Sequence, residues 1–325
     1  MVFKTKDRKI IGNSSKINEL VALCQQIAKG KSTVLIQGES GTGKELIARL
    51  IHKESPRADK PFVAVNCASF SEGLLESELF GHQKGAFTGA IEKKIGKMEL
   101  ADGGTILFDE ISEMDIQLQA KLLRAIQEKE IDPVGGKNPL PIDVRILATT
   151  NRELKKCVDE KKFREDLFYR LNVIPIKLPP LRERKEDIPV LIDYFLEKHC
   201  SENGFEKKTI TNEAIEIMTR QNWPGNIREL ENVIERAVII SLSHRIEKEH
   251  IFLEEGSEVE SEEKTGDSHQ LKIAAGVTMA EMEKKLILKT LKETQDNRQR
   301  AAEMLGIHVR TLRNKLNEYK NESTS

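Results

Sequence analysis

GESGTGKE, the segment from Gly38 to Glu45, follows the apolar run Val34–Ile36 and opens an amphipathic helical stretch. The spacing of its glycines and lysine is that of a phosphate-binding loop between a strand and a helix. Glycines let backbone N–H groups approach phosphate oxygens, the helix N-terminus attracts anions, and Lys44 reaches the β- and γ-phosphates. A Gly-rich turn that merely joins strand to helix is the alternative, and the complete strand–loop–helix context disfavours it. The predicted phosphate contacts are Gly38, Glu39, Ser40, Gly41, Thr42, Gly43, Lys44 and Glu45.

Short apolar runs alternate with segments of helical period from Ile10 to about Ile176. Such alternation predicts βα units that build a mostly parallel sheet covered by helices. We therefore expect an α/β domain over residues 1–176. Its candidate strands are Val34–Ile36, Phe62–Val65, Thr105–Phe108 and Val144–Ala148.

A small helical domain is expected over residues 177–253, after Pro179-Pro180 interrupts the chain. Here the sequence reads as helices only. The third helix has a clear start, because Asn226 follows Pro224-Gly225 and Glu229 lies three residues on, the spacing of a capping box. The candidate helices are Ile188–Cys200, Asn212–Gln221 and Asn226–Ser241.

Residues 254–275 are rich in Glu, Ser and Gly and poor in apolar side chains, and they predict a flexible acidic linker. Residues 276–325 predict a final helical unit. There the sequence reads helix, Gly turn, helix, the pattern of a helix-turn-helix. Its expected packing set is Ala301, Ala302, Leu305, Ile307, Leu312 and Leu316, and the helix before it carries an expected dimerisation face of Met279, Met282, Leu286 and Leu291.

Two adjacent carboxylates, Asp109 and Glu110, end the candidate strand that begins at Thr105. At the carboxyl end of a parallel sheet both can face the ligand crevice. Asp109 would hold Mg²⁺ and its water shell, and Glu110 would polarise the attacking water. An acidic pair at a loop entry is weak evidence alone, but the phosphate-binding loop upstream strengthens it. Glu45 is a second candidate for the metal, since Ser or Thr usually ligates Mg²⁺ at that position.

Polar residues end two further candidate strands. Asn66 follows Phe62–Val65, and its amide could hold the Glu110 carboxylate away from water or could simply form a strand-end turn. Thr150 and Asn151 follow Val144–Ala148, where an N-cap for the next helix is a frequent use of these residue types.

Three arginines are hard to explain as ordinary surface residues. Arg164 and Arg170 are six apart, about 240° of helical rotation, so they do not share a face. The alternative is that one or both are solvated residues paired with Glu165 or Asp166. Arg228 lies in the first turn of a helix, where a cation opposes the helix dipole, and this position favours a phosphate-facing role.

The segment GAFTGA places a single aromatic residue, Phe87, among small residues. Gly85 and Gly89 make the backbone poor as helix or strand interior. We expect Phe87 at an exposed loop tip, as an apolar contact for a partner. The alternative is that it packs into the core of its own domain. The segment consists of Gly85, Ala86, Phe87, Thr88, Gly89 and Ala90.

The helix-turn-helix carries a local basic excess, with five basic residues and one acid between Arg298 and Lys315. In a chain of net charge -1 this excess is the footprint of phosphate binding. The alternative is an ordinary helical hairpin with solvated arginines. The candidate contacts to double-stranded DNA are Arg298, Arg300, His308, Arg310, Thr311, Arg313, Asn314 and Lys315.

Over nearly its whole length the chain resembles the bacterial enhancer-binding activators of sigma-54 RNA polymerase. GESGTGKE is similar to their form of the phosphate-binding loop, and GAFTGA is the loop by which they engage sigma-54. The resemblance implies an AAA+ P-loop NTPase with a parallel sheet, an α-helical lid and a Fis-type helix-turn-helix. It also implies ATP and Mg²⁺ as cofactors. The expected partners are sigma-54 RNA polymerase holoenzyme, upstream enhancer DNA and further copies of the chain in a ring, with six subunits when active and a dimer possible when inactive.

The resemblance also assigns roles to single residues. Asn66 is implied as a switch on Glu110, and Thr150 with Asn151 as the sensor of the γ-phosphate. Arg164 and Arg170 are implied as arginine fingers supplied to the neighbouring subunit. Arg228 is implied as the second sensor, in the lid.

Composition excludes several other classes of protein. The apolar runs are too short to span a bilayer, and the first ten residues lack the apolar stretch of a secretory signal. The four scattered cysteines form no C-x-x-C pair and fit free thiols in a reducing cytosol. We therefore expect a cytoplasmic protein without a membrane partner.

Two other functions remain open. One is a DNA-bound AAA+ remodeller of another kind, such as a replication initiator, which GAFTGA disfavours. The other is a nucleotide-sensing regulator that does not hydrolyse ATP, which the Asp109-Glu110 pair disfavours. Two-component control is expected, yet no receiver domain precedes Ile10. Either a partner controls the protein or the chain is part of a longer one.

Overall fold

The computed structural model describes residues 10–253 apart from 70, 71, 88, 137 and 242, together with residues 287, 290, 294, 297–304, 309, 312, 315 and 316. The chain divides into two compact units, residues 1–260 and 261–325. None of the helices in the described ranges has the length and apolar character needed to cross a bilayer.

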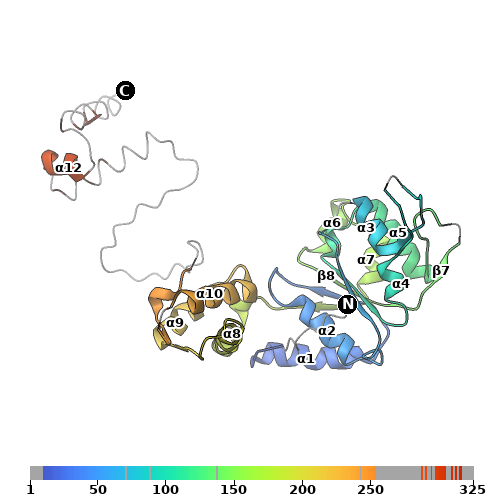
Figure 1. Ribbon diagram of the computed structural model, residues 1–325, viewed down its shortest axis with the longest axis horizontal. Coiled ribbons are helices and arrows are strands. Elements are labelled where there is room, and N and C mark those ends of the chain that lie inside the picture. Colours follow the sequence, from blue (N-terminus) through green and yellow to red (C-terminus); the bar gives the residue numbers. More distant parts are fainter. Residues whose placement is uncertain are drawn as a thin grey trace. The chain divides into compact units, whose positions relative to one another are not determined.

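The first unit is built on a five-stranded parallel sheet, as the alternating pattern predicted (Figure 1). The edge strand that begins at Ile174 was not among the candidates. It contains Pro175, and only Ile176 of its four residues is buried, so it has no continuous apolar run. The strands, in spatial order, are β2 (Phe62–Asn66), β5 (Thr105–Asp109), β8 (Arg145–Thr150), β1 (Val34–Gln37) and β9 (Ile174–Lys177).

Successive residues of the central strands enter two different cores. Leu35 of β1 packs on one face of the sheet, and its neighbours Val34 and Ile36 pack on the other. Because side chains alternate along a strand, a sheet covered on both faces needs strands that are apolar throughout. One core is closed by α1 (Ser15–Ala28) and α2 (Lys44–Lys53). The other is closed by α3 (Glu72–Phe80), α4 (Lys97–Leu100), α5 (Ile116–Glu128), α6 (Leu154–Asp159) and α7 (Glu165–Leu171) (Figure 1).

Short elements fill the connections of the α/β domain. Two hairpin-like pairs, β3 with β4 and β6 with β7, are antiparallel. The bounds are β3 (Gly81–His82), β4 (Lys94–Ile95), β6 (Glu130–Ile131) and β7 (Leu140–Pro141), with the 3-10 turns η1 (Ile111–Glu113), η2 (Leu181–Glu183) and η3 (Lys185–Asp187).

The lid packs three helices around Trp223, which is fully buried and donates from Nε1 to the Met218 carbonyl. The helices are α8 (Ile188–Glu202), α9 (Asn212–Arg220) and α10 (Asn226–Ile240). The expectation of helices only was wrong in detail, because β10 (Thr209–Ile210) pairs in parallel with β11 (Arg245–Ile246), ahead of the turn η4 (Lys248–His250). Two residues per strand are too few to leave a period in the sequence.

The start of α10 also differs from the predicted capping box. Gly225 is the N-cap residue, and the Glu229 carboxylate accepts from its backbone N–H (2.7 Å). Asn226 instead has a left-handed backbone (φ 54°) and directs its side chain outside the helix, where Oδ1 accepts from the Leu181 N–H (2.8 Å). Its amide therefore joins segments far apart in sequence.

The described residues of the second unit include α12 (Arg298–Met304). Ala301, Ala302 and Leu312 are buried together with Ile287, and Leu316 packs against them, which confirms four members of the predicted packing set. The other two, Leu305 and Ile307, lie outside the described residues. So do the predicted linker at 254–275 and the predicted dimerisation face, Met279, Met282, Leu286 and Leu291.

The N-terminus of α1 is bound to the start of the lid by one buried carboxylate. Asp187, fully buried, accepts from the backbone N–H groups of Asn13 (2.6 Å) and Ser14 (2.7 Å) and from the Ser14 hydroxyl (2.7 Å). Ser14 is itself the N-cap of α1. This carboxylate thus links the first helix of the α/β domain to the residue before α8.

We predict that Asp187→Ala lowers the free energy of unfolding by about 3 kcal/mol, because it leaves buried donors unpaired. Asp193→Ala, at an exposed position of α8, is the matched control and should change it by less than about 0.5 kcal/mol. Urea unfolding followed by circular dichroism measures both. Equal stability of the two variants would contradict the role given to Asp187.

Candidate nucleotide site, lid contacts and partner loop

The buried amine of Lys44 organises the loop between β1 and α2. Its Nζ donates to the carbonyls of Gly38 (3.0 Å) and Glu39 (3.2 Å) and lies 3.2 Å from Glu110 Oε1. The side chain is only 6% exposed, so these oxygens replace water around the charge. Gly43, at φ 100°, is the N-cap of α2 and has a backbone that L-residues avoid. The predicted phosphate-binding loop therefore has the required shape.

The carboxyl ends of neighbouring strands meet beside this loop. Gln37 of β1 is in register with Thr150 of β8, and Asn66 of β2 with Asp109 of β5. Glu110 then leaves the sheet with a left-handed backbone (φ 53°). In a regular strand the adjacent residues Asp109 and Glu110 would point to opposite faces of the sheet. The left-handed turn at Glu110 breaks this alternation and lets its carboxylate contact Lys44. The predicted carboxylate pair thus shares one crevice.

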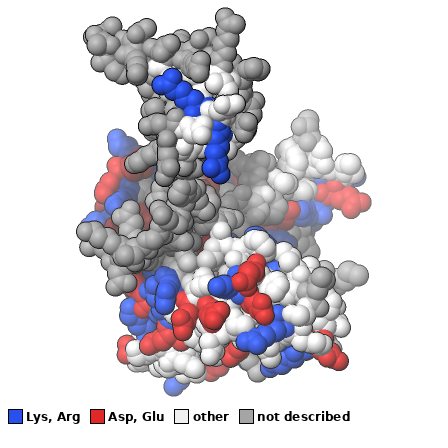
Figure 2. Space-filling model, turned by 90° about the vertical axis from the view of Figure 1, so that its left-hand side faces the viewer, with Lys and Arg blue, Asp and Glu red and all other residues white. Residues whose placement is uncertain are grey.

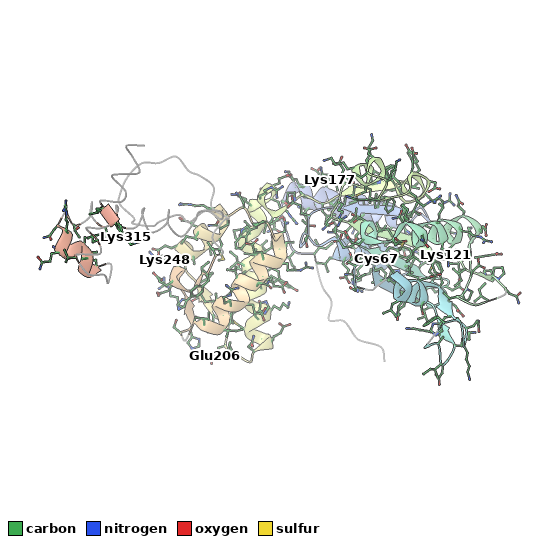
Figure 3. The ribbon with its side chains drawn as sticks, turned by 90° about the horizontal axis from the view of Figure 1, so that it is seen from above. Cys67, Lys121, Lys177, Glu206, Lys248 and Lys315 are labelled. Atoms are coloured by element: carbon green, nitrogen blue, oxygen red, sulfur yellow. The ribbon has the colours of Figure 1, made fainter. Side chains whose placement is uncertain are left out.

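Negative charge is concentrated at this edge of the sheet. Cys67, labelled in Figure 3, donates its backbone N–H to the Asp109 carbonyl (2.9 Å) and so continues the pairing of β2 with β5. Burial, and then the charges of Asp109 and Glu110, raise the pKa of the Cys67 thiol to about 12. The thiol therefore stays protonated beside the two carboxylates.

Asn66 adopts the turn geometry that was one of its two predicted uses. Its Oδ1 accepts from the Ala68 N–H (2.8 Å). The Glu110 carboxylate is held by Lys44 and by the Asn151 N–H (3.0 Å). A contact of Asn66 with Glu110 stays a prediction for another nucleotide state.

Of the two predicted sensor residues, Asn151 contacts the carboxylate pair, whereas Thr150 bonds to Ser112 and Arg152. Thr150 is buried, and its hydroxyl donates to Ser112 Oγ (3.0 Å) and accepts from the Arg152 N–H (3.0 Å). Asn151 reaches Glu110 through its backbone N–H. Both lie at the crevice, and their reading of a γ-phosphate stays a prediction.

Thr149, which the sequence reasoning missed, contacts both members of the carboxylate pair. Its hydroxyl donates to Asp109 Oδ1 (2.5 Å) and accepts from the Glu110 N–H (3.0 Å). The alternation of side chains along a strand could have predicted this contact. Leu147 and Leu107 pack on the face of the sheet that α2 covers, so Thr149 and Asp109, two residues further along each strand, lie on that face too.

Asp109 fits a divalent cation better than Glu45 does. Burial raises the pKa of the Asp109 carboxyl, the Thr149 hydrogen bond lowers it, and the charges of Glu110 and Glu45 raise it again. A cation would relieve that charge, and Mg²⁺ prefers oxygen ligands. The Glu45 carboxylate instead accepts two hydrogen bonds from Arg49, at 2.8 and 2.6 Å. The described residues contain no cluster of three His, Cys, Asp or Glu side chains suited to a metal.

The lid contacts the phosphate-binding loop at consecutive residues. Glu39 accepts two hydrogen bonds from Arg182 (2.8 and 2.6 Å) and one from Asn226 (3.2 Å), and the Arg182 bonds hold the pKa of its carboxyl below the ordinary value. Arg228 Nη1 donates to Ser40 Oγ (3.2 Å). The structure thus brings Arg228 to the loop, as expected from its position in the helix, whereas Arg182 and Asn226 were not foreseen.

The backbones of lid and loop are in direct contact at Gly41. The Ile227 N–H donates to its carbonyl (3.0 Å), and a Cβ built on Gly41 would lie 2.2 Å from the Gly225 carbonyl oxygen. With φ 76° as well, this position admits no other residue without movement of the lid. The position of the lid is therefore coupled directly to the backbone that would surround phosphates.

The GAFTGA segment forms a tight loop with an exposed aromatic tip. Phe87 is 45% exposed, and its ring meets His82 edge-on at 5.0 Å between centroids. The Gly85 N–H donates to the Ala90 carbonyl (2.8 Å), which closes the loop. Phe87 is therefore not part of the core, in agreement with the prediction. Thr88 lies outside the described residues.

Comparison with known protein families assigns each part of the chain to a described domain. The family profile described as the Sigma-54 interaction domain matches residues 10–177, that of the AAA+ ATPase lid domain matches 182–268, and that of the Bacterial regulatory protein, Fis family, matches 278–319. The chain belongs to the sigma-54-dependent transcriptional activators. It is accordingly a DNA-binding activator whose AAA+ domain hydrolyses ATP.

Several members of this family are similar along most of the chain. The transcriptional regulatory protein FlbD of Caulobacter vibrioides is 50% identical over 324 residues, which cover 97% of this chain and 71% of FlbD. The regulatory protein AtoC of Escherichia coli is 48% identical over 312 residues, covering 95% and 67%. A crystal structure of NtrX from Brucella abortus in complex with ADP superposes with a TM-score of 0.77 at 32% identity, covering 96% of this chain and 69% of that one.

The two predicted arginine fingers of this sigma-54 activator lie at the two ends of α7. Arg164 is the N-cap residue of α7 and pairs with Asp166 (2.7 Å), as the alternative reading proposed. Arg170 lines a cleft with Lys31 and Val144, at the amino ends of β1 and β8. Because the phosphate-binding loop follows the opposite, carboxyl end of β1, Arg170 lies away from the site of its own subunit. The action of both arginines on a neighbour stays a prediction.

The DNA-binding unit of the activator is described in part. Arg298 and Arg300 are exposed on α12, and Lys315 is half-buried. Figure 2 shows these basic side chains in blue on the described part of the unit. The other predicted contacts, His308, Arg310, Thr311, Arg313 and Asn314, lie outside the described residues.

We predict that Gly41→Ala weakens nucleotide binding at least about 10-fold, because its Cβ collides with the Gly225 carbonyl. Gly103→Ala is a matched control: Gly103 has a similar φ of 71°, but nothing lies within 4 Å of the added carbon. Titration with a fluorescent ADP measures both affinities. If the two variants bind equally well, the lid contact at Gly41 has no part in nucleotide binding.

Proposed function

We propose that this chain acts in a homo-oligomeric ring, with six subunits expected, in which ATP hydrolysis moves the Gly85–Ala90 loop against sigma-54 RNA polymerase holoenzyme and opens a promoter. The observation that carries the proposal is Phe87, a large apolar side chain held 45% exposed at the tip of a closed loop. An exposed aromatic residue of this kind is a contact for a partner.

The base of that loop is suited to transmit movement. The Gln83 N–H donates to the Val134 carbonyl, and the Val134 N–H donates to the Gly81 carbonyl, each at 2.9 Å. The Ser77 and His82 side chains also form a hydrogen bond (2.7 Å), which joins the loop base to α3. The base of the loop is therefore fixed to the α/β domain, while the Phe87 ring at the tip meets His82 and stays 45% exposed.

In the proposed chemistry, arriving phosphates compete for Lys44, and Glu110 is released from its ion pair to polarise the attacking water. Asp109 would hold Mg²⁺, which neutralises charge on the phosphate oxygens, while Glu45 remains with Arg49. Asn66 would restrain Glu110 until a partner is engaged. Thr150, Asn151 and Arg228 would report the nucleotide state to the rest of the domain.

Arg164 and Arg170 would complete the site of the adjacent subunit, which is supported by the place of Arg170 at the opposite end of the sheet from the loop of its own chain. Arginine fingers of this kind contribute roughly 10³-fold or more to turnover. The C-terminal unit would bind double-stranded enhancer DNA in the cytoplasm. A dimer is the expected inactive form.

The two competing functions lose support on specific grounds. A replication initiator has no use for GAFTGA, and the first family profile is described by its interaction with sigma-54. A regulator that only senses nucleotide is at odds with a carboxylate pair of which one member, Glu110, contacts Lys44. Turnover of ATP by Glu110→Gln at the rate of the unchanged chain would revive the second reading.

We predict that Phe87→Ala or Thr88→Ala leaves ATP turnover within about 3-fold and abolishes open-complex formation, because the loop lies apart from the hydrolytic residues. Phe205→Ala is the control, an aromatic residue of similar exposure (43%) in the lid, and it should retain both activities. Turnover is measured by phosphate release, and promoter opening by permanganate reactivity. Open complexes formed by both loop variants would refute the role of the loop.

The trans action of Arg164 has its own test. Glu110→Gln and Arg164→Ala subunits should each be inactive alone, and a 1:1 mixture should regain about a quarter of normal ATP turnover, since random neighbours then combine an intact base with an intact finger. Replacing the first partner by the double variant Glu110→Gln/Arg164→Ala removes the intact finger and serves as control. An arginine acting within its own subunit would give no recovery in either mixture.

A further inference from the structure

One threonine hydroxyl connects the two carboxylate residues of the site. Thr149 Oγ1 donates its hydrogen to Asp109 Oδ1 at 2.5 Å and accepts from the backbone N–H of Glu110 at 3.0 Å. A hydroxyl has one hydrogen to donate, and here that hydrogen is used on Asp109. The Asp109 side chain and the Glu110 backbone are thus both hydrogen-bonded to a single atom of β8, Thr149 Oγ1.

The end of the β5–β8 pairing leaves the Glu110 N–H without a backbone acceptor, and Thr149 Oγ1 fills this role. Pairing of β5 with β8 ends at Phe108 and Ala148, and Glu110 turns away with φ 53°. Its N–H has no ladder partner at that point, and Thr149 Oγ1 takes the place of a strand carbonyl. The neighbouring Thr150 faces the opposite side of the sheet, where it bonds Ser112. It cannot substitute for Thr149.

The direction of the hydroxyl is fixed by its surroundings. Thr149 is fully buried, and a β-branched side chain on a strand has little freedom at χ1. The short distance to Asp109 is typical of a hydroxyl that donates to a carboxylate. A fixed donor of this kind orients a carboxylate more narrowly than water does.

We propose that Thr149 is a positioning residue that sets the orientation of Asp109 relative to Glu110 and thereby aligns the water-activating carboxylate with the metal-binding one. The inference rests on the roles proposed above for Asp109 and Glu110, and it holds whether or not Phe87 contacts sigma-54.

The test compares Thr149→Val with Thr149→Ser in the full chain. Valine keeps the shape and removes the hydroxyl, so turnover (kcat) should fall about 10²-fold, the effect of misplacing a reacting group by roughly 1 Å. The KM for ATP should change by less than about 3-fold, because the phosphate loop is intact. Serine keeps the hydroxyl and should return kcat to within about 5-fold of the unchanged chain, since it loses only the packed methyl group.

A second measurement does not depend on turnover. Binding of Mn²⁺ in the presence of ADP, followed by electron paramagnetic resonance, should weaken about 10-fold in Thr149→Val, since the donor that orients Asp109 is gone, and recover in Thr149→Ser. A merely structural threonine would not separate these two variants in metal affinity.

Thr105→Val is the matched control. Thr105 is also fully buried on β5, but its hydroxyl bonds His52 Nδ1 (3.0 Å), at the opposite end of the strand from Asp109. It should leave kcat and Mn²⁺ affinity unchanged, whatever it does to the melting temperature. Equal kcat in Thr149→Val and the unchanged chain, or equal loss in the serine and valine variants, overturns the proposal. A Glu110→Gln variant without effect on kcat would instead refute the hydrolytic assignment.

Discussion

A single buried ammonium group, that of Lys44, sets the conditions for the rest of the nucleotide site. A charge that is 6% exposed must be compensated, and here two loop carbonyls and the Glu110 carboxylate surround it. The Lys44 charge is therefore balanced by groups of the protein itself, which hold the loop in shape. A phosphate that enters exchanges one anionic partner of the lysine for another. The carboxylate released by that exchange is the one at which water would be activated.

The lid takes part in the same network through the backbone of the loop. Glu39 contacts Arg182 and Asn226, Ser40 contacts Arg228, and Gly41 contacts Ile227. Because these residues are consecutive, the loop cannot shift around a ligand without altering its contacts with the lid. The loop that would bind the nucleotide is thus in direct contact with the lid. No longer chain of side-chain contacts is needed to couple the two.

Local patterns were enough to predict much of this arrangement. Strong local signals predicted four of the five strands, the lid helices and the carboxylate pair at the end of β5. The edge strand β9 escaped notice because Pro175 and partial exposure break its apolar run. The contacts of Glu39 with Asn226 and Arg182 could not be predicted from the sequence. They join residues separated by 187 and 143 positions, and a single sequence contains no local pattern that reports such distant contacts. Thr149 was overlooked beside Thr150 and Asn151, although alternation along β8 had already placed it on the α2 face.

The near contact of Gly41 with the Gly225 carbonyl has a consequence for protein engineering. The two segments fit each other closely, because the Gly225 carbonyl leaves no room for a single additional carbon on Gly41. A chimaera that takes its lid from one relative and its α/β domain from another must therefore inherit both the 38–44 turn and the 224–228 turn from the same parent.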